Sequence, residues 1–238
     1  MSENQALHYN TPSTEENLKG VAAIFDMDGT LIDNTPFHFK AWQQVFEKYG
    51  LPALTKETYQ GEISGVPIPN TVEKFFAQVQ GAAPDLIAEE KQHLYQVAFK
   101  PYLQPINGLE NFLAELKDSG MKIALATSSS MADVDFIFNG ISIRQYFDVI
   151  VTGNMVSKPK PNPQIFLKAA EQLHALPEKC LVFEDSTAGL KAGHDAGMKV
   201  VGITTAHAAE KIKQVANLVI NDYAGLKLQE LAVLFDDK

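Results

Sequence analysis

A chain of 238 residues is long enough to bury a sizeable core, as one large domain or one domain with an insertion. The 20 lysines and arginines against 29 aspartates and glutamates give a net charge of −9, which argues against a nucleic-acid partner, because binding to the phosphate backbone needs a basic face. The single cysteine, Cys180, excludes an intrachain disulfide framework and favours a reducing compartment.

The N-terminal segment, residues 1–19, is polar and predicts a tail on or near the surface. It has no apolar stretch long enough for a signal peptide or a membrane span. We therefore expect a cytoplasmic protein, monomeric, with neither membrane nor nucleic acid among its partners.

The first strand is predicted in the apolar run 20–25, and acidic residues follow it directly. The stretch "FDMDGTLID" brings Asp26, Asp28 and Asp33 close together in sequence, with no cationic residue beside them. Carboxylates this close repel one another, so the segment is either a solvated turn or a place where a cation binds.

From Pro36 to about Lys100 the sequence predicts helices and no convincing strand. Glycine and proline separate the helical stretches. We expect an all-helical cap domain over 35–100, inserted after the first strand. Its amphipathic helices are predicted over 36–50, 68–81 and 84–100.

Short apolar runs then alternate with helices, a pattern that predicts a parallel sheet covered on both faces. The fold class is therefore α/β, with a Rossmann-like core over 20–34 and 101–238 and the helical cap between its two parts. Further strands are predicted over 122–127, 148–153, 180–183, 199–204 and 218–220. Further helices are predicted over 109–119, 162–173, 187–197 and 226–235.

Polar side chains follow three of the predicted strands: Asp26 the first, Thr127 the second, and Glu184 with Asp185 a third. Because ligands bind at the carboxyl ends of parallel strands, we expect these side chains to meet at one edge of the sheet. Asp28 adds a fourth acid. Oxygen ligands without histidine or thiol suit Mg²⁺, so the sequence predicts a magnesium site.

This set of residues indicates phosphoryl transfer. A carboxylate can attack phosphorus, and we assign that role to Asp26. Asp28 lies on the same side of the chain and suits proton donation and activation of water. Gly29 lets the backbone approach a phosphate. Thr127 and Ser128 precede a helix, so hydroxyl and backbone donors there can bind the transferring oxygens.

A fixed positive charge is expected from Lys158 or Lys160 in "SKPKPNPQIF". Alternating prolines keep this loop extended and stiff. Asn162 and Pro163 suit the start of the next helix, which places Lys160 a short step before it. The other lysine is expected to be a solvated loop charge.

Four stretches, in this order, resemble the motifs of the haloacid dehalogenase superfamily: "DMDGT", "TSS", the lysine of "KPNPQIF" and "FEDSTAGLKAGHDAGM". The resemblance covers nearly the whole chain beyond the tail. It is closest to the branch with a small helical cap, which includes β-phosphoglucomutase and sugar-phosphate phosphatases. It implies Mg²⁺ dependence and an aspartyl-phosphate intermediate. The lysine it implies is Lys160, six residues before Phe166. The metal ligands it implies are the side chain of Asp26, the backbone carbonyl of Asp28, Asp185 and, directly or through water, Glu184.

In the cap, His38 resembles a histidine that contacts the acid/base aspartate, and Lys91 a lysine that reaches the substrate. Two positions depart from the mutase pattern. Ile68 replaces an arginine that grips the non-reacting phosphate, and only Ser129 survives of a serine-lysine-asparagine set, because Ser130–Met131 follow it. Losing a guanidinium fork weakens the grip on a second phosphate. We therefore favour hydrolysis of a monophosphate, with Gly29, Ser128 and the residues named here in contact with the substrate.

Simpler interpretations stay open for several residues. His38 lies on an apolar helix face, where a buried core histidine is an equal alternative. Lys91 follows Glu89–Glu90, a setting typical of the surface. Glu184–Asp185 could cap the next helix, and one of the pair could do only that.

The leading hypothesis is a Mg²⁺-dependent phosphatase that acts on a small phosphorylated metabolite, most simply a sugar phosphate. The first alternative is β-phosphoglucomutase, which converts β-glucose 1-phosphate to glucose 6-phosphate. A dehalogenase would need neither metal nor Asp28. A phospho-receiver domain is a remote alternative, since receivers are shorter and have no helical insertion.

Overall fold

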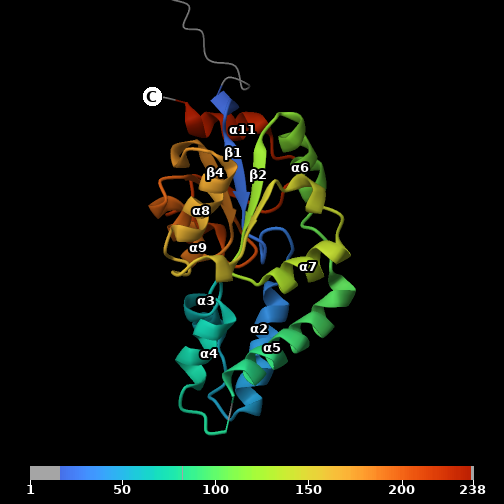
Figure 1. Cartoon of the computed structure of the whole chain (residues 1–238), viewed down its shortest axis with the longest axis vertical. Coiled ribbons are helices and arrows are strands. Elements are labelled where there is room, and N and C mark those ends of the chain that lie inside the picture. The colour runs from blue at the N-terminus through green and yellow to red at the C-terminus, as the bar shows by residue number, and fades with distance from the viewer. Residues whose placement is uncertain (1–16, 82, 237–238) are drawn as a thin grey trace, which may run out of the picture.

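Six parallel strands form one sheet in the order β3-β2-β1-β4-β5-β6 (Figure 1). This computed structural model describes residues 17–81 and 83–236. Every strand expected from an apolar run is present, so the α/β prediction is confirmed. The strands are β1 (Ala22–Phe25), β2 (Lys122–Ala126), β3 (Val149–Val151), β4 (Cys180–Glu184), β5 (Lys199–Ile203) and β6 (Leu218–Ile220).

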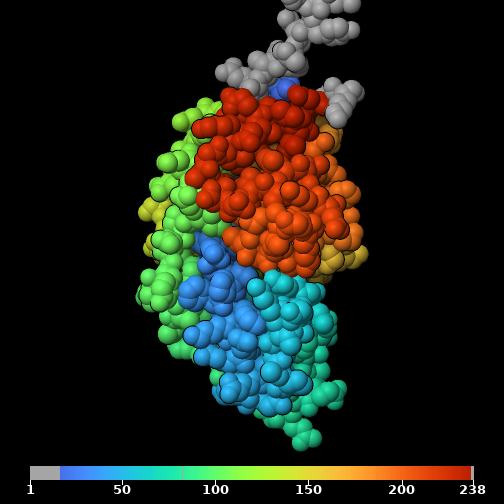
Figure 2. Space-filling model, turned by 180° about the vertical axis from the view of Figure 1, so that it is seen from behind, coloured from blue at the N-terminus to red at the C-terminus, as the bar shows by residue number. Residues whose placement is uncertain are grey.

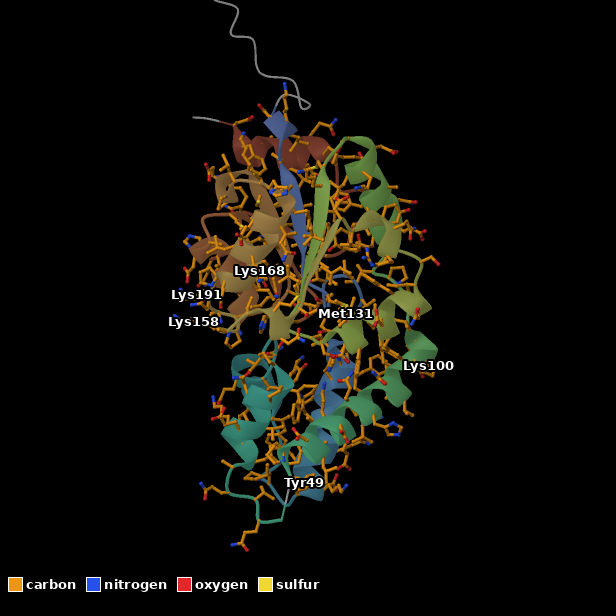
Figure 3. All side chains as sticks on the ribbon, in the orientation of Figure 1. Tyr49, Lys100, Met131, Lys158, Lys168 and Lys191 are labelled. Carbon is orange, nitrogen blue, oxygen red and sulfur yellow. The ribbon has the colours of Figure 1, made fainter. Side chains whose placement is uncertain are left out.

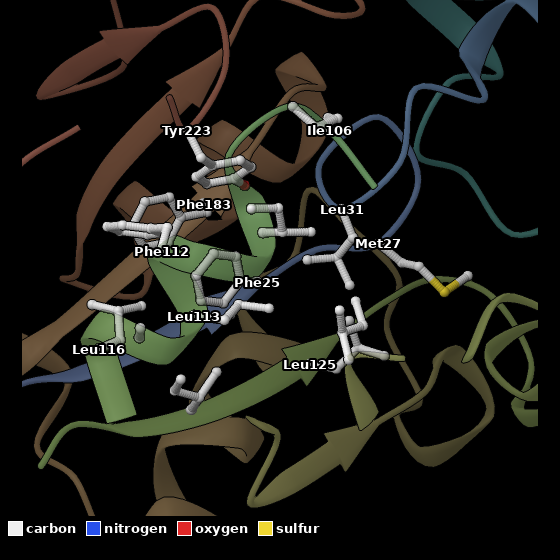
Figure 4. Packing of buried hydrophobic residues seen from close by; sticks show 14 of the residues in the cluster. Phe25, Met27, Leu31, Ile106, Phe112, Leu113, Leu116, Leu125, Phe183 and Tyr223 are labelled. Carbon is white, nitrogen blue, oxygen red and sulfur yellow. The ribbon is translucent and has the colours of Figure 1, made fainter. Parts of the chain in front are cut away.

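The central strands are apolar on both faces because helices cover the sheet from both sides. Ala23 and Phe25 of β1 belong to one hydrophobic cluster, while Ala22 and Ile24 belong to the other. This alternation follows from the two-residue period of a strand. In the first cluster the rings of Phe25 and Phe183 stack with their centroids 4.4 Å apart (Figure 4).

The helices of the core divide between these two faces. Buried residues of α6, α7 and α11 belong to the cluster of Phe25, and those of α8, α9 and α10 belong to the other. The bounds are α6 (Leu109–Asp118), α7 (Met131–Gly140), α8 (Gln164–Leu173), α9 (Thr187–Asp195), α10 (Ala209–Ile212) and α11 (Leu228–Ala232).

Between β1 and α6 the described residues form four α-helices, which we call the helical insertion (35–99). They are α2 (Thr35–Lys48), α3 (Lys56–Glu62), α4 (Ile68–Phe76) and α5 (Pro84–Phe99). They lie beyond the carboxyl ends of the strands, below the core in Figures 1 and 2. The insertion has its own hydrophobic cluster, around Trp42, Phe46 and Phe76.

Helix α3 has no counterpart among the helices expected from sequence. It is seven residues long, contains Gly61, and buries only Tyr59, so it has no apolar period to detect. Its start is set locally, because the Thr55 side chain accepts a hydrogen bond from the Thr58 N–H.

Most of the predicted polar tail, residues 1–16, lies outside the described residues. A surface position is wrong for Leu18, which is 7% exposed and packs in the cluster of Phe25. An apolar side chain beside the sheet is more stable buried than in water. None of the helices in the described part of the chain is long and apolar enough to cross a membrane.

The order of the strands reverses at β1, which pairs with β2 on one side and β4 on the other. Ligands bind in open parallel sheets at this point, outside the carboxyl ends of the strands. The insertion faces the same edge (Figure 1). The fold therefore places the expected ligand site beside the residues that end β1, β2 and β4.

Candidate active site

Three buried acids meet at the carboxyl ends of β1 and β4. Asp26 follows β1, while Glu184 ends β4 and Asp185 follows it. The pairing of Phe25 with Phe183 aligns the two strands, so the acids come out side by side. One carboxylate oxygen from each lies within 4.8 Å of the others.

This cluster carries more negative charge than its protein neighbours neutralise. Burial raises the pKa of Asp26 and of Asp185 well above the ordinary value, and the charge on Glu184 raises both further. The charge of Lys160 lowers the pKa of both acids, but not enough to offset burial and repulsion. Buried oxygen donors this close together, with unsatisfied negative charge, are the set that a hard divalent cation binds. The residues present therefore fit a metal site.

Lys160 contacts the cluster directly. Its Nζ lies 2.6 Å from Asp26 Oδ1, 3.6 Å from Glu184 Oε1 and 3.3 Å from the carbonyl oxygen of Ala126. Burial would lower the pKa of Lys160, but the charges of Asp26 and Glu184 raise it overall. Lys158 is exposed at the edge of the core (Figure 3). Of the two candidate lysines, the structure therefore places Lys160 at the site.

Two glycines allow the chain to approach these carboxylates closely. Gly29 has φ +76°, and a Cβ built there would lie 1.9 Å from Asp185 Oδ2. In α9, a Cβ at Gly189 would lie 2.1 Å from the carboxyl carbon of Glu184. Thr205, from the loop after β5, donates to the Gly29 carbonyl at 2.5 Å and to Asp185 at 3.3 Å. Sequence reasoning missed Thr205, because no motif marks that loop.

Asp28 has separate surroundings that favour its charged form. Ser129 Oγ donates to Oδ2 at 2.7 Å, Asn34 Nδ2 donates to Oδ1 at 2.6 Å, and His38 Nε2 lies 3.3 Å from Oδ1. Burial alone would raise the pKa of Asp28, but these partners hold it well below the ordinary value. Asp33, the third acid of the stretch, is exposed and takes no part.

Asn34 is a site residue that sequence reasoning missed. Its position just before α2 resembles a helix N-cap, but its side chain makes no capping hydrogen bond. The side chain is fully buried; its Oδ1 accepts from the Gly29 N–H at 3.1 Å, and its Nδ2 lies 2.7 Å from the Tyr95 hydroxyl. The amide thus connects the loop after β1 with α5 beside Asp28.

Lys91 and His38 extend this network into the insertion. Lys91 is 2% exposed, so a surface position is wrong for it. Its Nζ lies 2.7 Å from His38 Nδ1 and over the rings of Trp42 and Tyr95, with 5.1 Å to the Tyr95 centroid. Burial lowers the pKa of Lys91 to about 8, although Asp28 opposes this. Neighbouring Lys91 also contributes, after burial, to a lowered pKa for His38. His38 is accordingly more than a core histidine: it connects Lys91 to Asp28.

The residues after β2 divide among three tasks. Thr127 is buried, and its Oγ1 accepts from the Ser129 N–H at 3.0 Å. Ser129 holds Asp28, as described above. Ser128 Oγ donates to the Gly65 carbonyl at 2.9 Å, so it connects the core to the loop between α3 and α4.

A cavity of about 550 Å³ lies where these groups meet. Of the residues expected at the site, Gly29, Thr127, Lys160 and Glu184 do not line it. Each lies beside a residue that does: Gly29 and Glu184 beside Asp185, Thr127 beside Ser129, and Lys160 beside Asp26. The lining includes Asp26, Asp28, His38, Lys91, Ser128, Ser129 and Asp185. Its size is in the range typical of small-molecule sites.

Known proteins are similar to this chain in sequence and in fold. The family model described as haloacid dehalogenase-like hydrolase matches residues 23–203. A phosphorylated carbohydrates phosphatase from Thermotoga maritima is 35% identical over 191 residues, 75% of this chain and 82% of the relative. A β-phosphoglucomutase from Bacillus subtilis is 32% identical over 191 residues, 76% of this chain and 82% of the relative.

The structural comparison agrees with these sequence matches. The crystal structure of a β-phosphoglucomutase from Clostridium difficile superposes with a TM-score of 0.78 at 26% identity, covering 90% of this chain and 96% of that one. The matched family region includes β1 from its second residue, the whole of β4 and all three clustered acids. The chain belongs to the haloacid dehalogenase-like hydrolases, and it is an enzyme of that family.

Proposed function

We propose that this enzyme is a Mg²⁺-dependent phosphatase that hydrolyses a small sugar phosphate or similar phosphorylated metabolite through an aspartyl-phosphate on Asp26. The observation that carries this proposal is the position of Asp26, which lies in the buried acid cluster, contacts Lys160 and shares one cavity with Asp28. The phosphatase and mutase relatives support the same substrate class.

Two carboxylates carry the proposed reaction: Asp26 is the nucleophile, and Asp28 is the acid and base. An oxygen of Asp26 attacks phosphorus, and the bond from phosphorus to the ester oxygen breaks while Asp28 gives that oxygen a proton. Water then attacks the phosphorus of the aspartyl-phosphate and gives its proton to Asp28, which returns Asp26 and releases phosphate. Lys160 offsets the negative charge that gathers around Asp26.

The side chains of Asp26 and Asp185 and the backbone carbonyl of Asp28 would hold Mg²⁺, with Glu184 as a direct or water-mediated neighbour. The ion would supply positive charge next to the transferring phosphoryl group. The raised pKa values of Asp26 and Asp185 support this assignment, because a bound cation would offset the burial and the repulsion that raise them.

The depressed pKa of Asp28 suits the second half of this reaction. Partners from both the core and the insertion keep the carboxylate ionised, ready to take a proton from water. For the first half it must be protonated. A bound phosphate dianion favours that form, because a nearby negative charge raises the pKa of a carboxyl group.

The insertion acts as a cap over the site in this proposal. Besides the contact of Ser128 with Gly65, the Gln60 side chain donates to the Ala206 carbonyl at 2.7 Å. Such contacts across the cavity exclude water and bring Lys91 and His38 to the substrate. Thr127, Ser128 and Ser129 are the proposed donors for phosphate oxygens, and a bound phosphate would replace the contacts of the two serine hydroxyls with Gly65 and Asp28. The Gly29 N–H is bonded to the Ile32 carbonyl and to Asn34 Oδ1, so Gly29 contributes its close backbone approach rather than a donor.

Asp26→Asn tests the proposal. We expect kcat for phosphate release to fall at least about 10⁴-fold, because the amide cannot form the phosphoenzyme, while the circular dichroism spectrum is unchanged. Asp33→Asn, an exposed change in the same stretch, is the matched control and should keep full activity. Mass spectrometry after a rapid acid quench should find a phosphoryl group on Asp26 of the wild type. Full activity of Asp26→Asn would refute the assignment.

β-Phosphoglucomutase is the second candidate, because relatives of that name match in both sequence and structure. Phosphorus NMR distinguishes the two reactions when β-glucose 1-phosphate is supplied with a trace of the bisphosphate. Free phosphate indicates the phosphatase, and glucose 6-phosphate indicates the mutase. Ile68, an apolar side chain in the cavity lining, supports the phosphatase.

A further inference from the structure

The charges around the cavity constrain the part of the substrate that does not react. Among the described residues that line it, Lys91 is the only lysine or arginine. Two further carboxylates, Glu89 and Asp133, join the lining in addition to the acids near Asp26. A ligand group placed beyond the reacting phosphate therefore meets acidic and neutral side chains.

Lys91, the one cationic side chain in this lining, already interacts with other groups of the protein. Lys91 Nζ contacts His38 Nδ1 and the face of Tyr95, and the charges of Asp28 and Asp133 act on it to raise its pKa against the effect of burial. The charges of two carboxylates of the protein thus already act on it before any ligand arrives. They weaken the attraction that Lys91 exerts on a second anionic group of the substrate.

Asp133 is held firmly at the start of α7. Its Oδ2 accepts hydrogen bonds from the Ser130 N–H at 3.0 Å and the Ser130 hydroxyl at 2.7 Å, and its Oδ1 accepts from Gln92 of α5. The Ser130 donors could otherwise bind an anion from solution, as free donors at a helix start do. A carboxylate of the protein occupies them instead, between the core and the insertion.

The other described side chains that line the cavity do not reverse this effect. Ile68 and Met131 are apolar, and the remaining polar groups nearby are neutral, such as Gln96 and Asn70 in the lining. Met131 begins α7 at the level where the core meets the insertion (Figure 3). The described residues on the far side of the cavity therefore carry a net negative charge, which is partly open to solvent because Glu89 is exposed and Asp133 is half-buried.

We propose that Asp133 is a specificity-determining residue, which makes the enzyme select phosphate monoesters whose remaining part carries no second anion. This inference rests on the proposed phosphatase function. Asp133 acts by repulsion, so it lowers the affinity for bisphosphates and phosphorylated acids rather than adding a contact to the preferred substrate. Hydroxyl groups of a sugar meet the neutral amides without this penalty.

A matched pair of aryl phosphates measures the effect. Phenyl phosphate and 4-carboxyphenyl phosphate differ by one negative charge away from the reacting group. With Mg²⁺ present, we expect the wild type to prefer phenyl phosphate in kcat/KM by at least about tenfold, chiefly through KM. Asp133→Asn, which keeps the shape and the acceptor oxygen, should reduce this preference about tenfold. Asp133→Ser should do the same, which covers the case in which the first variant folds poorly.

The control is Asp135→Asn, which removes the same charge from an exposed position two residues along α7 and should leave the ratio unchanged. Raising the salt concentration should shrink the preference of the wild type but not that of Asp133→Asn, which a purely structural role would not produce. An unchanged ratio in both Asp133 variants, or a wild type that prefers the carboxylated ester, would overturn the inference. Absence of phosphate release from either ester by the wild type would overturn the proposed function, and the inference with it.

Discussion

The core and the helical insertion each bury one lysine beside the cavity, and the two lysines have opposite surroundings. Lys160 of the core lies against carboxylates, and its pKa is raised. Lys91 of the insertion lies against a histidine and two aromatic rings, and burial lowers its pKa to about 8. The comparison shows that the core sets one lysine against an excess of carboxylates, whereas the insertion encloses a lysine that contacts no carboxylate directly.

This difference corresponds to two tasks in the proposed reaction. The core holds the groups that perform the chemistry at the ends of β1, β2 and β4, where the sheet fixes their spacing. The insertion supplies Lys91 and His38 from helices held by apolar packing, so their positions depend on how the insertion meets the core. Four predictions test this division.

The largest expected effect is the difference between two variants, in which one or the other buried lysine is replaced by methionine. Lys160→Met leaves the acid cluster without its lysine. In the absence of metal we expect the free energy of unfolding to fall by about 3 kcal/mol. With Mg²⁺ present, kcat should fall at least about 10³-fold. Lys91→Met removes a buried charge that lies against a histidine and two aromatic rings, and it should change stability by less than about 1 kcal/mol, or raise it. Urea denaturation in EDTA measures both. Equal losses in the two variants would contradict the comparison.

The next effect concerns two glycines with a left-handed backbone. Gly29→Ala forces a Cβ against Asp185, so we expect about 3 kcal/mol of destabilisation and at least a hundredfold loss of kcat/KM. Gly50→Ala, after α2 in the insertion, meets no atom within 4 Å and should cost only the backbone strain, about 1 kcal/mol. Thermal denaturation with activity assays tests the pair. The idea of a closely packed core site fails if Gly29→Ala is as mild as Gly50→Ala.

Metal should stabilise the core through its acids. At a Mg²⁺ concentration about 100 times Kd, the free energy of unfolding should rise by about 2.7 kcal/mol relative to EDTA. Asp185→Asn should abolish most of this gain, whereas Lys91→Met should keep it. Differential scanning calorimetry with and without Mg²⁺ provides the measurement, and a full gain in Asp185→Asn would exclude this cluster as the metal site.

The smallest effect is a pH dependence that comes from the insertion. Lys91 has a pKa of about 8, so its charge is complete below that pH and is lost as the pH rises through it. We expect kcat/KM to fall above pH 8 for this reason. Lys91→Arg keeps its charge and should move the fall to higher pH, while Lys91→Met should lack it. The same shift makes stability rise from about pH 8 towards 10.5, because the unfolded chain holds the proton longer. A wild-type profile unchanged in Lys91→Met would exclude Lys91 as the cause.

Sequence patterns predicted the core better than the insertion, for a physical reason. Continuous apolar runs define buried parallel strands, and polar residues directly after them can only meet at one edge, so Asp26, Glu184 and Asp185 were found together. In the insertion, packing between helices decides which polar residues face inward. The environment of Lys91 and the helix α3 could therefore not be read from spacing.

Asn34 and Asp133 show a second limit of prediction from the sequence. Both stand at helix starts, where the residue type alone indicates a cap. The Asp133 side chain completes the capping box of α7 and also lines the cavity, while the Asn34 side chain makes no capping hydrogen bond. Only the tertiary structure separates these cases. The domain boundaries, the monomeric state and the cytoplasmic location stay predictions.

The way the insertion joins the core has a consequence for how such proteins diversify. The two connecting segments touch each other: Ile32 bridges to Pro105, and the Ile106 N–H donates to the Leu31 carbonyl at 2.9 Å. A segment whose ends already adjoin can be exchanged for a longer or shorter one at little entropic cost to the remainder. The same hydrolytic machinery could thus be refitted with other modules at this junction, each giving access to different metabolites without a change to the sheet beneath.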